Sequence, residues 1–199
     1  MRHRHRLTLK YAPPKIWLFT DRRNDGALER IIAALPRNAG IIFRHYHLAE
    51  RERRLRFAAI MRLARKRNLP VFLADDPPTA RRWGADGFHR LHSRRSAAAG
   101  LCHSAPVHDV REISRAARNG AAIYFLSPAY PTQSHPGAPA LNHLQLRKLS
   151  QTCPGPVFLL GGMTHHHARA LRDLKVAGWA AIDGLSGDSQ DQNRICVPT

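Results

Sequence analysis

An apolar segment at residues 123–126 runs directly into a loop of prolines, hydroxyl side chains, a histidine and a glycine, which ends near residue 137. Proline fixes its own φ and pushes the residue before it to extended conformations, so this loop is stiff. The loop carries Thr132, Ser134 and His135 as three hydrogen-bonding groups close together. Stiff polar loops that follow strands hold many functional sites in α/β proteins, so we interpret these residues as candidate ligands of a substrate. An ordinary proline-rich connection to the next helix is the alternative.

Two glycine-containing segments follow apolar runs later in the chain. Gly161 and Gly162 come after the run at 157–160, and Gly184 comes with Asp183 after the last run. Glycines at the end of a strand allow backbone N–H groups to approach an anion closely. These segments therefore predict a phosphate-binding site, and tight turns without a ligand are the alternative.

Two carboxylates and three histidines have types that could hold a metal ion. Asp75 and Asp76 end the apolar run at 71–74, where their oxygens could bind Mg²⁺ together with phosphate and water. A loop end and helix cap before two prolines is the equally weighted alternative. The three histidines at 165–167 point in different directions on a helix, so a solvated helix start is favoured over a metal site there.

Eight apolar runs must position these groups, and they alternate along the chain with helical patterns. The runs begin near residues 16, 40, 70, 86, 99, 121, 156 and 178. Continuous apolar strands that alternate with amphipathic helices predict a parallel sheet covered by helices. Eight such strands predict a compact α/β protein with a (β/α)8 barrel, and a doubly wound open sheet is the main competitor. In such a barrel the active site lies where the strands end and the helices begin.

The predicted helices are recognised by the spacing of their apolar residues. One stripe runs from Leu28 to Leu35, and Asp109 is placed to cap a later helix. A second stripe is broader, and arginines that we expect to be mostly solvated fill the rest of its helix. The residues of this second stripe are Leu55, Ala58, Ala59, Met61 and Leu63.

Composition limits the class of protein. The 199 residues include 32 Lys and Arg against 14 Asp and Glu, a formal charge of +18, which favours anionic partners. The basic residues are spread along the chain without interleaved aromatics, so a solvated basic surface is favoured over nucleic-acid binding. No apolar run approaches the length of a membrane span, no secretory signal is recognisable, and the three cysteines fit a reducing cytoplasm. We expect a basic arm at 1–15, a barrel domain at 16–187 and a tail at 188–199.

Several ordered motifs together resemble the thiamine phosphate synthase and thiazole tautomerase superfamily, and they are closest to thiamine phosphate synthase. Their order and spacing hold from about residue 15 to residue 187. The matching segments are Leu18-Phe19-Thr20-Asp21, Arg44, Asp75, residues 84–89, His108, residues 120–132, Leu160-Gly161-Gly162-Met163 and residues 178–182.

The resemblance implies a barrel that joins two small molecules. In the synthase, a pyrimidine methyl diphosphate loses pyrophosphate bound to Mg²⁺, and the nitrogen of a thiazole phosphate captures the resulting cation. The resemblance assigns diphosphate binding to Arg44, a Mg²⁺ contact to Asp75, and pyrophosphate contacts to Thr132 and Ser134. It assigns the thiazole phosphate to a site made of Gly161, Gly162, Asp183 and Gly184.

The chain departs from the pattern of this family at positions that handle charge. The family places an asparagine before the metal aspartate, a second metal aspartate, two lysines and a serine where this chain has other residues. These residues are Ala74, Arg94, Tyr46, His135 and Asp183. Because the second carboxylate position is Arg94, we predict that dependence on Mg²⁺ is weak or absent.

We therefore predict a thiamine phosphate synthase-like transferase that binds small phosphorylated metabolites, with Arg44, His108 and His135 as candidate catalytic residues. A divergent isomerase resembling thiazole tautomerase, with His108 or His135 as proton carrier, is one alternative. A non-catalytic binder of phosphorylated ligands is another. No membrane association is expected, nucleic-acid binding is disfavoured, and the possibility of a homodimer is left open.

Overall fold

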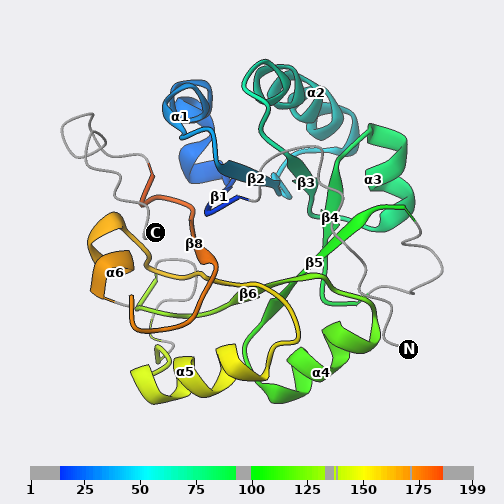
Figure 1. The fold of residues 1–199 in the computed structure, drawn as a ribbon. Helices are drawn as coiled ribbons and strands as arrows, with labels where there is room; N and C mark the ends of the chain where they lie inside the picture. Colours follow the sequence, from blue (N-terminus) through cyan, green and yellow to red (C-terminus); the bar gives the residue numbers. More distant parts are fainter. Residues whose placement is uncertain (1–13, 93–99, 133–136, 138, 171, 186–199) are drawn as a thin grey trace.

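The structure, a computed structural model, describes residues 14–92, 100–132, 137, 139–170 and 172–185. It shows a closed barrel of eight parallel strands, in which each strand pairs with the next in the chain and the last pairs with the first. The predicted (β/α)8 barrel is therefore confirmed (Figure 1). The strands are β1 (Ile16–Phe19), β2 (Ala39–Phe43), β3 (Val71–Leu73), β4 (Gly87–His89), β5 (Cys102–Val107), β6 (Ile123–Leu126), β7 (Val157–Leu159) and β8 (Gly178–Ala181).

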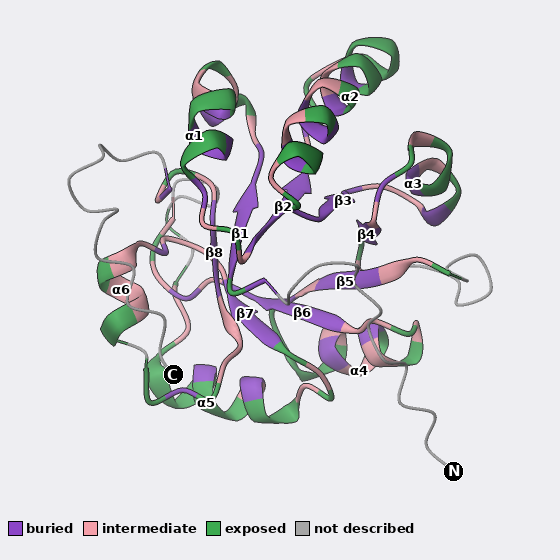
Figure 2. Ribbon diagram, turned by 45° about the horizontal axis from the view of Figure 1, so that its top comes forward, coloured by how far each residue is buried: buried purple, intermediate pink, exposed green. Residues whose placement is uncertain are grey.

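Helices surround the barrel and turn one face towards it (Figures 1 and 2). The α-helices are α1 (Leu28–Ala34), α2 (Glu50–Lys66), α3 (Pro77–Trp83), α4 (Val110–Arg118), α5 (His143–Thr152) and α6 (His165–Ala170), and a short 3₁₀ helix spans Arg22–Ala27. Asp109 caps α4, as the sequence predicts, by accepting a hydrogen bond from the N–H of Glu112 at 2.8 Å. The expected arm and tail lie outside the described residues, apart from positions 14 and 15. None of the helices described is long and apolar enough to cross a membrane.

The interior of the barrel is filled by aromatic rings that meet across it, from β1 to strands that do not pair with β1. Trp17 on β1 meets Phe72 on β3, Phe125 on β6 and Phe158 on β7, with ring centroids 5.0, 5.6 and 6.0 Å apart. Gly40 on β2 makes room for the indole, because a Cβ there would lie 2.6 Å from it. The barrel centre is thus solid, and any ligand must bind at its rim.

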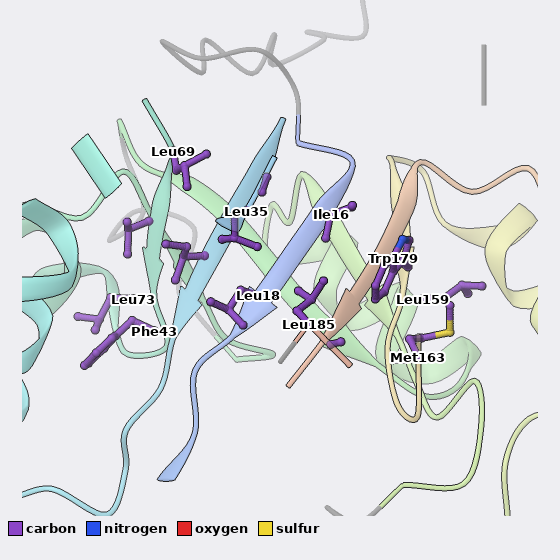
Figure 3. Close-up of a cluster of buried hydrophobic side chains, with 14 of the residues drawn as sticks. Ile16, Leu18, Leu35, Phe43, Leu69, Leu73, Leu159, Met163, Trp179 and Leu185 are labelled. Atoms are coloured by element: carbon purple, nitrogen blue, oxygen red, sulfur yellow. The ribbon is translucent and has the colours of Figure 1, made fainter. Parts of the chain in front are cut away.

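A second core lies between the barrel and the helices. Alternate strand residues point outwards, so Ile16 and Leu18 of β1 lie there while Trp17 faces the interior. Figure 3 shows part of this outer core, including Leu18, Phe43 and Trp179. This double burial explains why the strands read as continuous apolar runs in the sequence.

The predicted face of α2 is only partly right. Met61 is buried and Leu63 packs against the core as expected, but Leu55 is 65% exposed. The buried residues of the helix are Arg53, Phe57, Ile60, Met61 and Ala64. This face also has helical spacing, but it includes an arginine, which an apolar pattern passes over. The expectation of solvated arginines is therefore wrong for Arg53, whose charge is met by a carboxylate at the barrel rim.

Candidate active site

A cavity of about 590 Å³ lies at the carboxyl ends of the strands, within the size range of small-molecule sites. It brings together many of the predicted residues, although they come from the ends of β2, β5, β6, β7 and β8. These residues are Arg44, His108, Thr132, Gly161, Gly162, Asp183 and Gly184. Asp75 does not line the cavity, and Ser134, His135 and Arg94 lie outside the described residues.

The glycine loop after β7 is folded so that its carbonyl groups are used and its N–H groups are left open. Gly161 and Gly162 have φ of +94° and +60°, which side-chain-bearing residues rarely adopt. The carbonyl of Gly161 accepts from the N–H of Tyr130 at 3.0 Å, and that of Gly162 contacts Nδ1 of His167 at 2.7 Å. Within the described ranges, the N–H groups of Gly161, Gly162 and Gly184 have no hydrogen-bond partner. Unpaired N–H groups that line a cavity are suited to an anion.

The requirement for glycine in these loops has a cause besides a ligand. A Cβ on Gly162 would lie 2.5 Å from the carbonyl oxygen of Pro131, and a Cβ on Gly184 would lie 2.1 Å from that of Met163. The three loops after β6, β7 and β8 therefore touch through their main chains. A substitution of Gly162 tests this packing as well as any approach of phosphate.

The three consecutive histidines of α6 point in different directions, as the sequence predicts, but the expected solvated helix start holds only for His166. His167 stacks on Tyr130, with ring centroids 3.9 Å apart, and holds the glycine loop through Gly162. His165 meets the ring of Trp179 edge-on at 4.9 Å, and His166 is exposed. His167 is thus a support of the loop, a role that residue type alone does not indicate.

Arg44 is held at the rim by the end of β1. Its Nε donates to the carbonyl of Thr20 at 3.0 Å, and its Nη2 donates to Asp21 at 2.6 Å. Its guanidinium lies 5.7 Å from the centroid of the Phe19 ring. The side chain is 20% exposed and lines the cavity, so it can meet an anion while keeping these contacts.

The acidic residues nearest to Arg44 share a second arginine. Arg23 contacts Asp21 at 3.1 Å and Asp183 at 3.1 Å. Burial raises the pKa of Asp21, but the hydrogen bond from the backbone N–H of Arg23 and the charge of Arg44 outweigh it, so the pKa lies below its usual value. Arg23 also offsets the negative charge of Asp183, which stands where the family pattern has a serine. The sequence gives no sign of this pairing.

A buried hydrogen-bond chain supports the position of Arg44 from below. The N–H of Arg44 donates to Oγ1 of Thr20, which lies 2.8 Å from Nδ1 of His45. Nε2 of His45 lies 2.8 Å from Oδ1 of Asp25, which also accepts from Nε of Arg56 at 2.8 Å. The arrangement assigns a hydroxyl proton to Nδ1 and an imidazole proton to Asp25. Burial lowers the pKa of His45 despite Asp25, which favours this neutral form.

Buried aromatic groups form the floor below Arg44. His89 packs edge-on against Phe19 and Phe125, both with ring centroids 5.3 Å away, and its Nδ1 lies 3.0 Å from Oγ of Ser104. Burial, reinforced by the charge of Arg44, lowers the pKa of His89 to about 3. His89 is therefore neutral at ordinary pH and contributes no charge to the site.

Asp75 and Asp76 are both engaged within the protein. Asp75 Oδ2 accepts from Nη1 of Arg53 at 2.5 Å, and its Oδ1 accepts from the N–H of Asp76 at 2.8 Å. Asp76 caps α3 by accepting from the N–H of Thr79 at 2.7 Å, the alternative that the sequence left open. In the part of the chain that the structure describes, no three His, Cys, Asp or Glu side chains are grouped to hold a metal ion. These residues do not fit the Mg²⁺ that the resemblance implies.

His108 extends from the end of β5 into the wall of the cavity. Its Nδ1 lies 2.7 Å from Oε2 of Glu112, which also accepts from the backbone N–H of His108 at 2.8 Å. The side chain is 51% exposed. A histidine held by a carboxylate and open to a cavity can carry a proton to or from a ligand.

The sequence matches the family model described as thiamine monophosphate synthase over residues 16–185. Thiamine-phosphate synthase of Bacillus velezensis is 28% identical over 144 residues, which cover 68% of this chain and 64% of that protein, just under two thirds of its length. Thiamine-phosphate synthase of Pyrococcus furiosus is 26% identical over 180 residues, 87% of each chain.

Solved structures share the fold. Thiamine phosphate pyrophosphorylase from Pyrococcus furiosus superposes with a TM-score of 0.75 at 23% identity, over 90% of each chain. The N-acetylmannosamine-6-phosphate 2-epimerase from Clostridium perfringens has a TM-score of 0.64 at 13% identity, over 93% of each chain. The likeness therefore extends to barrels whose names describe another reaction. Because the family model spans nearly the whole barrel, this chain belongs to the thiamine monophosphate synthase family.

Proposed function

We propose that this protein joins a pyrimidine methyl diphosphate to a thiazole phosphate and releases pyrophosphate. Membership of the family supports this reaction, and so do the names of the curated relatives. The single observation that carries the proposal is one cavity with two kinds of anion-binding group. Arg44 offers a guanidinium, and Gly161, Gly162 and Gly184 offer N–H groups that have no hydrogen-bond partner among the described residues.

Two anion-binding groups suit a reaction between two phosphorylated substrates. The glycine N–H groups would hold the monoester phosphate of the thiazole, because main-chain donors bind an anion without adding a titrating group. Arg44 would grip the diphosphate, with Thr132 adding a hydroxyl from the loop after β6. Ser134 and His135 remain proposed partners of the same anion on that loop.

This reaction depends on positive charge that stabilises the leaving pyrophosphate, and it does not depend on a general base. The bond between the methylene carbon and the diphosphate oxygen breaks, and its electron pair leaves with the pyrophosphate. The thiazole nitrogen donates its lone pair to the methylene carbon, so no proton is moved in the step that forms the bond. Arg44 favours this step because negative charge grows on the leaving group beside it.

The test is turnover of the two substrates by the full chain, followed as thiamine phosphate and pyrophosphate. Arg44→Ala should lower kcat/KM by roughly thirtyfold, the loss expected for one charge-assisted bidentate contact of about 2 kcal/mol. Arg62→Ala is the matched control, because Arg62 is exposed on α2 outside the cavity. No product from the wild-type chain with either metal or chelator present would sink the proposal.

The pair of His108 and Glu112 favours one second candidate, an isomerase that shifts a proton on a thiazole phosphate. In that case His108→Gln should abolish interconversion of the thiazole tautomers. In the transferase it should change turnover little, since no proton moves when the bond forms. The same variant therefore separates the two functions.

Other expectations from the sequence stay predictions. We infer that the partners are small phosphorylated metabolites and that the location is cytoplasmic, which the cysteine content supports. Sedimentation of the full chain would decide between monomer and homodimer.

A further inference from the structure

We propose that the guanidinium of Arg53 takes the place of a divalent cation at the ends of β2 and β3, so that this site handles phosphorylated ligands without Mg²⁺. The proposal rests on the proposed function only in taking the cavity as a phosphate site. Arg53 is on α2, which lies outside these two strands (Figure 1). Its side chain is 10% exposed, so its positive charge is held inside the protein rather than in solvent.

Three oxygen atoms converge on this one guanidinium. Nε donates to the carbonyl of Arg44 at 2.7 Å, Nη1 to Oδ2 of Asp75 at 2.5 Å, and Nη2 to the carbonyl of Ala74 at 3.0 Å. A carboxylate and two carbonyls are the oxygen ligands that a hard cation would take at this position. The arginine satisfies them with directed N–H bonds, so an incoming ion would have to break all three.

The surroundings of Arg53 are also suited to a guanidinium and unsuited to a metal ion. The faces of Tyr46 and Trp83 lie 5.3 and 5.5 Å from the guanidinium carbon, in cation–π geometry. Tyr46 stands where the resemblance expects a lysine, and Ala74 stands where it expects a metal-binding asparagine. A lysine at position 46 would repel Arg53, whereas the tyrosine ring attracts it. Both departures thus lie in contact with Arg53, Tyr46 through its ring and Ala74 through its carbonyl.

The arrangement also fixes the charge of the site. Asp75 and Arg53 neutralise each other, so the rim at the end of β3, outside the lining of the cavity, carries no uncompensated carboxylate. A divalent ion near Asp75 would face the guanidinium as a like charge at short range. The site therefore keeps one permanent cation there in place of an exchangeable one.

The test is direct binding of Mn²⁺, as a spectroscopic substitute for Mg²⁺, to the full chain followed by electron paramagnetic resonance. Wild type should show no saturable site up to about 1 mM, the weak end of protein sites for hard cations. Arg53→Met keeps an apolar stem but frees three oxygens, and it should gain a site at least roughly tenfold tighter than any in wild type. Arg54→Met, an exposed neighbour on α2, makes the same change in net charge and should gain none.

Several outcomes would overturn the proposal. One is saturable Mn²⁺ binding by wild type that Asp75→Asn abolishes, and this result needs no Arg53 variant that folds. Another is a folded Arg53→Met that binds no more Mn²⁺ than wild type, because the guanidinium would then not be what keeps the ion out. Turnover that needs Mg²⁺ and Asp75 would also overturn it, while leaving the proposed function intact. Absence of turnover with the expected Mn²⁺ results would instead remove the proposed function alone.

Discussion

The rim of the barrel has two halves, which differ in whether their polar groups are paired within the protein. In the side-chain half, at the ends of β1, β2 and β3, charged residues pair with one another, as Asp25 does with Arg56 and Asp75 with Arg53. In the main-chain half, the loops after β6, β7 and β8, N–H groups at Gly161, Gly162 and Gly184 have no partner within the described ranges. The charged side chains of the first half are therefore mostly engaged within the protein, and the donors without a partner among the described residues lie in the glycine backbone.

This difference follows from geometry. Long side chains can turn towards a neighbour of opposite charge, and in a low-dielectric rim that pairing is strongly favoured. A main-chain N–H has a direction set by φ and ψ, so a loop held by its carbonyls keeps its donors pointed where the backbone dictates. Of the charged residues in the side-chain half, only Arg44 both pairs and lines the cavity.

The largest effect on stability and on phosphate affinity should come from a substitution in the main-chain half. Gly162→Ala places a Cβ against the carbonyl of Pro131 at φ of +60°, so it should cost roughly 2–4 kcal/mol of stability and lower phosphate affinity at least about tenfold. Urea unfolding and calorimetry measure the two changes. Gly100→Ala is the matched control, because its φ is +80° but a Cβ there meets no atom of the described residues within 4 Å. It should cost about 1 kcal/mol through strain alone and leave phosphate binding intact. Phosphate binding by Gly162→Ala equal to that of wild type would remove the main-chain half as the binding site.

The next effect concerns acid stability, which we expect to depend on buried histidines beneath the rim. The pKa of His89 is about 3 when folded and about 6.5 when unfolded, so only the unfolded chain takes up its proton between these values. The free energy of unfolding should therefore fall as pH falls below 6.5, by up to about 1.4 kcal/mol per pH unit from this residue, until pH approaches 3.

His89→Gln should flatten this dependence while keeping a hydrogen bond to Ser104. Urea midpoints at pH 7, 6 and 5 measure the slope for the variant and for wild type. His92→Gln, which replaces a histidine not buried, is the control and should keep the wild-type slope. Equal slopes for His89→Gln and wild type would show that acid acts elsewhere.

A smaller effect should follow from removing an ion pair of the side-chain half that lies away from the cavity. Asp25→Asn removes the negative charge that Arg56 and buried His45 share, although Arg56 keeps its contact with Glu29, so it should cost about 1–3 kcal/mol of stability. Phosphate affinity should change less than about twofold, because Asp25 does not line the cavity. A tenfold loss of affinity with little loss of stability would reverse the roles that we assign to the two halves.

The smallest effect should be a gain in phosphate affinity. Asp21 competes with any anion for Arg44 and Arg23, so Asp21→Asn should tighten phosphate binding by about fivefold, a change of roughly 1 kcal/mol. Glu50→Gln removes one negative charge from the exposed start of α2 and serves as the control for net charge. Weaker phosphate binding in Asp21→Asn would mean that Asp21 positions Arg44 more than it competes for it.

The sequence alone determined the barrel, the rim position of Arg44 and the glycine loops. Continuous apolar runs occur because each strand is buried on both sides. The positive φ of Gly161 and Gly162 favours glycine at these positions. Both features can therefore be recognised from the residue types of a short segment. The cap at Asp109 belongs to the same class, since its bond reaches only three residues along the chain.

Tertiary structure alone decided which polar groups are free. Arg53 was one of many arginines until the fold brought it to Asp75, and Arg23 met Asp183 across the closure of the barrel. The buried face of α2 was predicted only partly correctly for the same reason. An arginine can lie on the buried face of a helix only when a carboxylate nearby in space pairs with it. Partners distant in sequence carry no local pattern, and charges pair according to distance in space rather than along the chain.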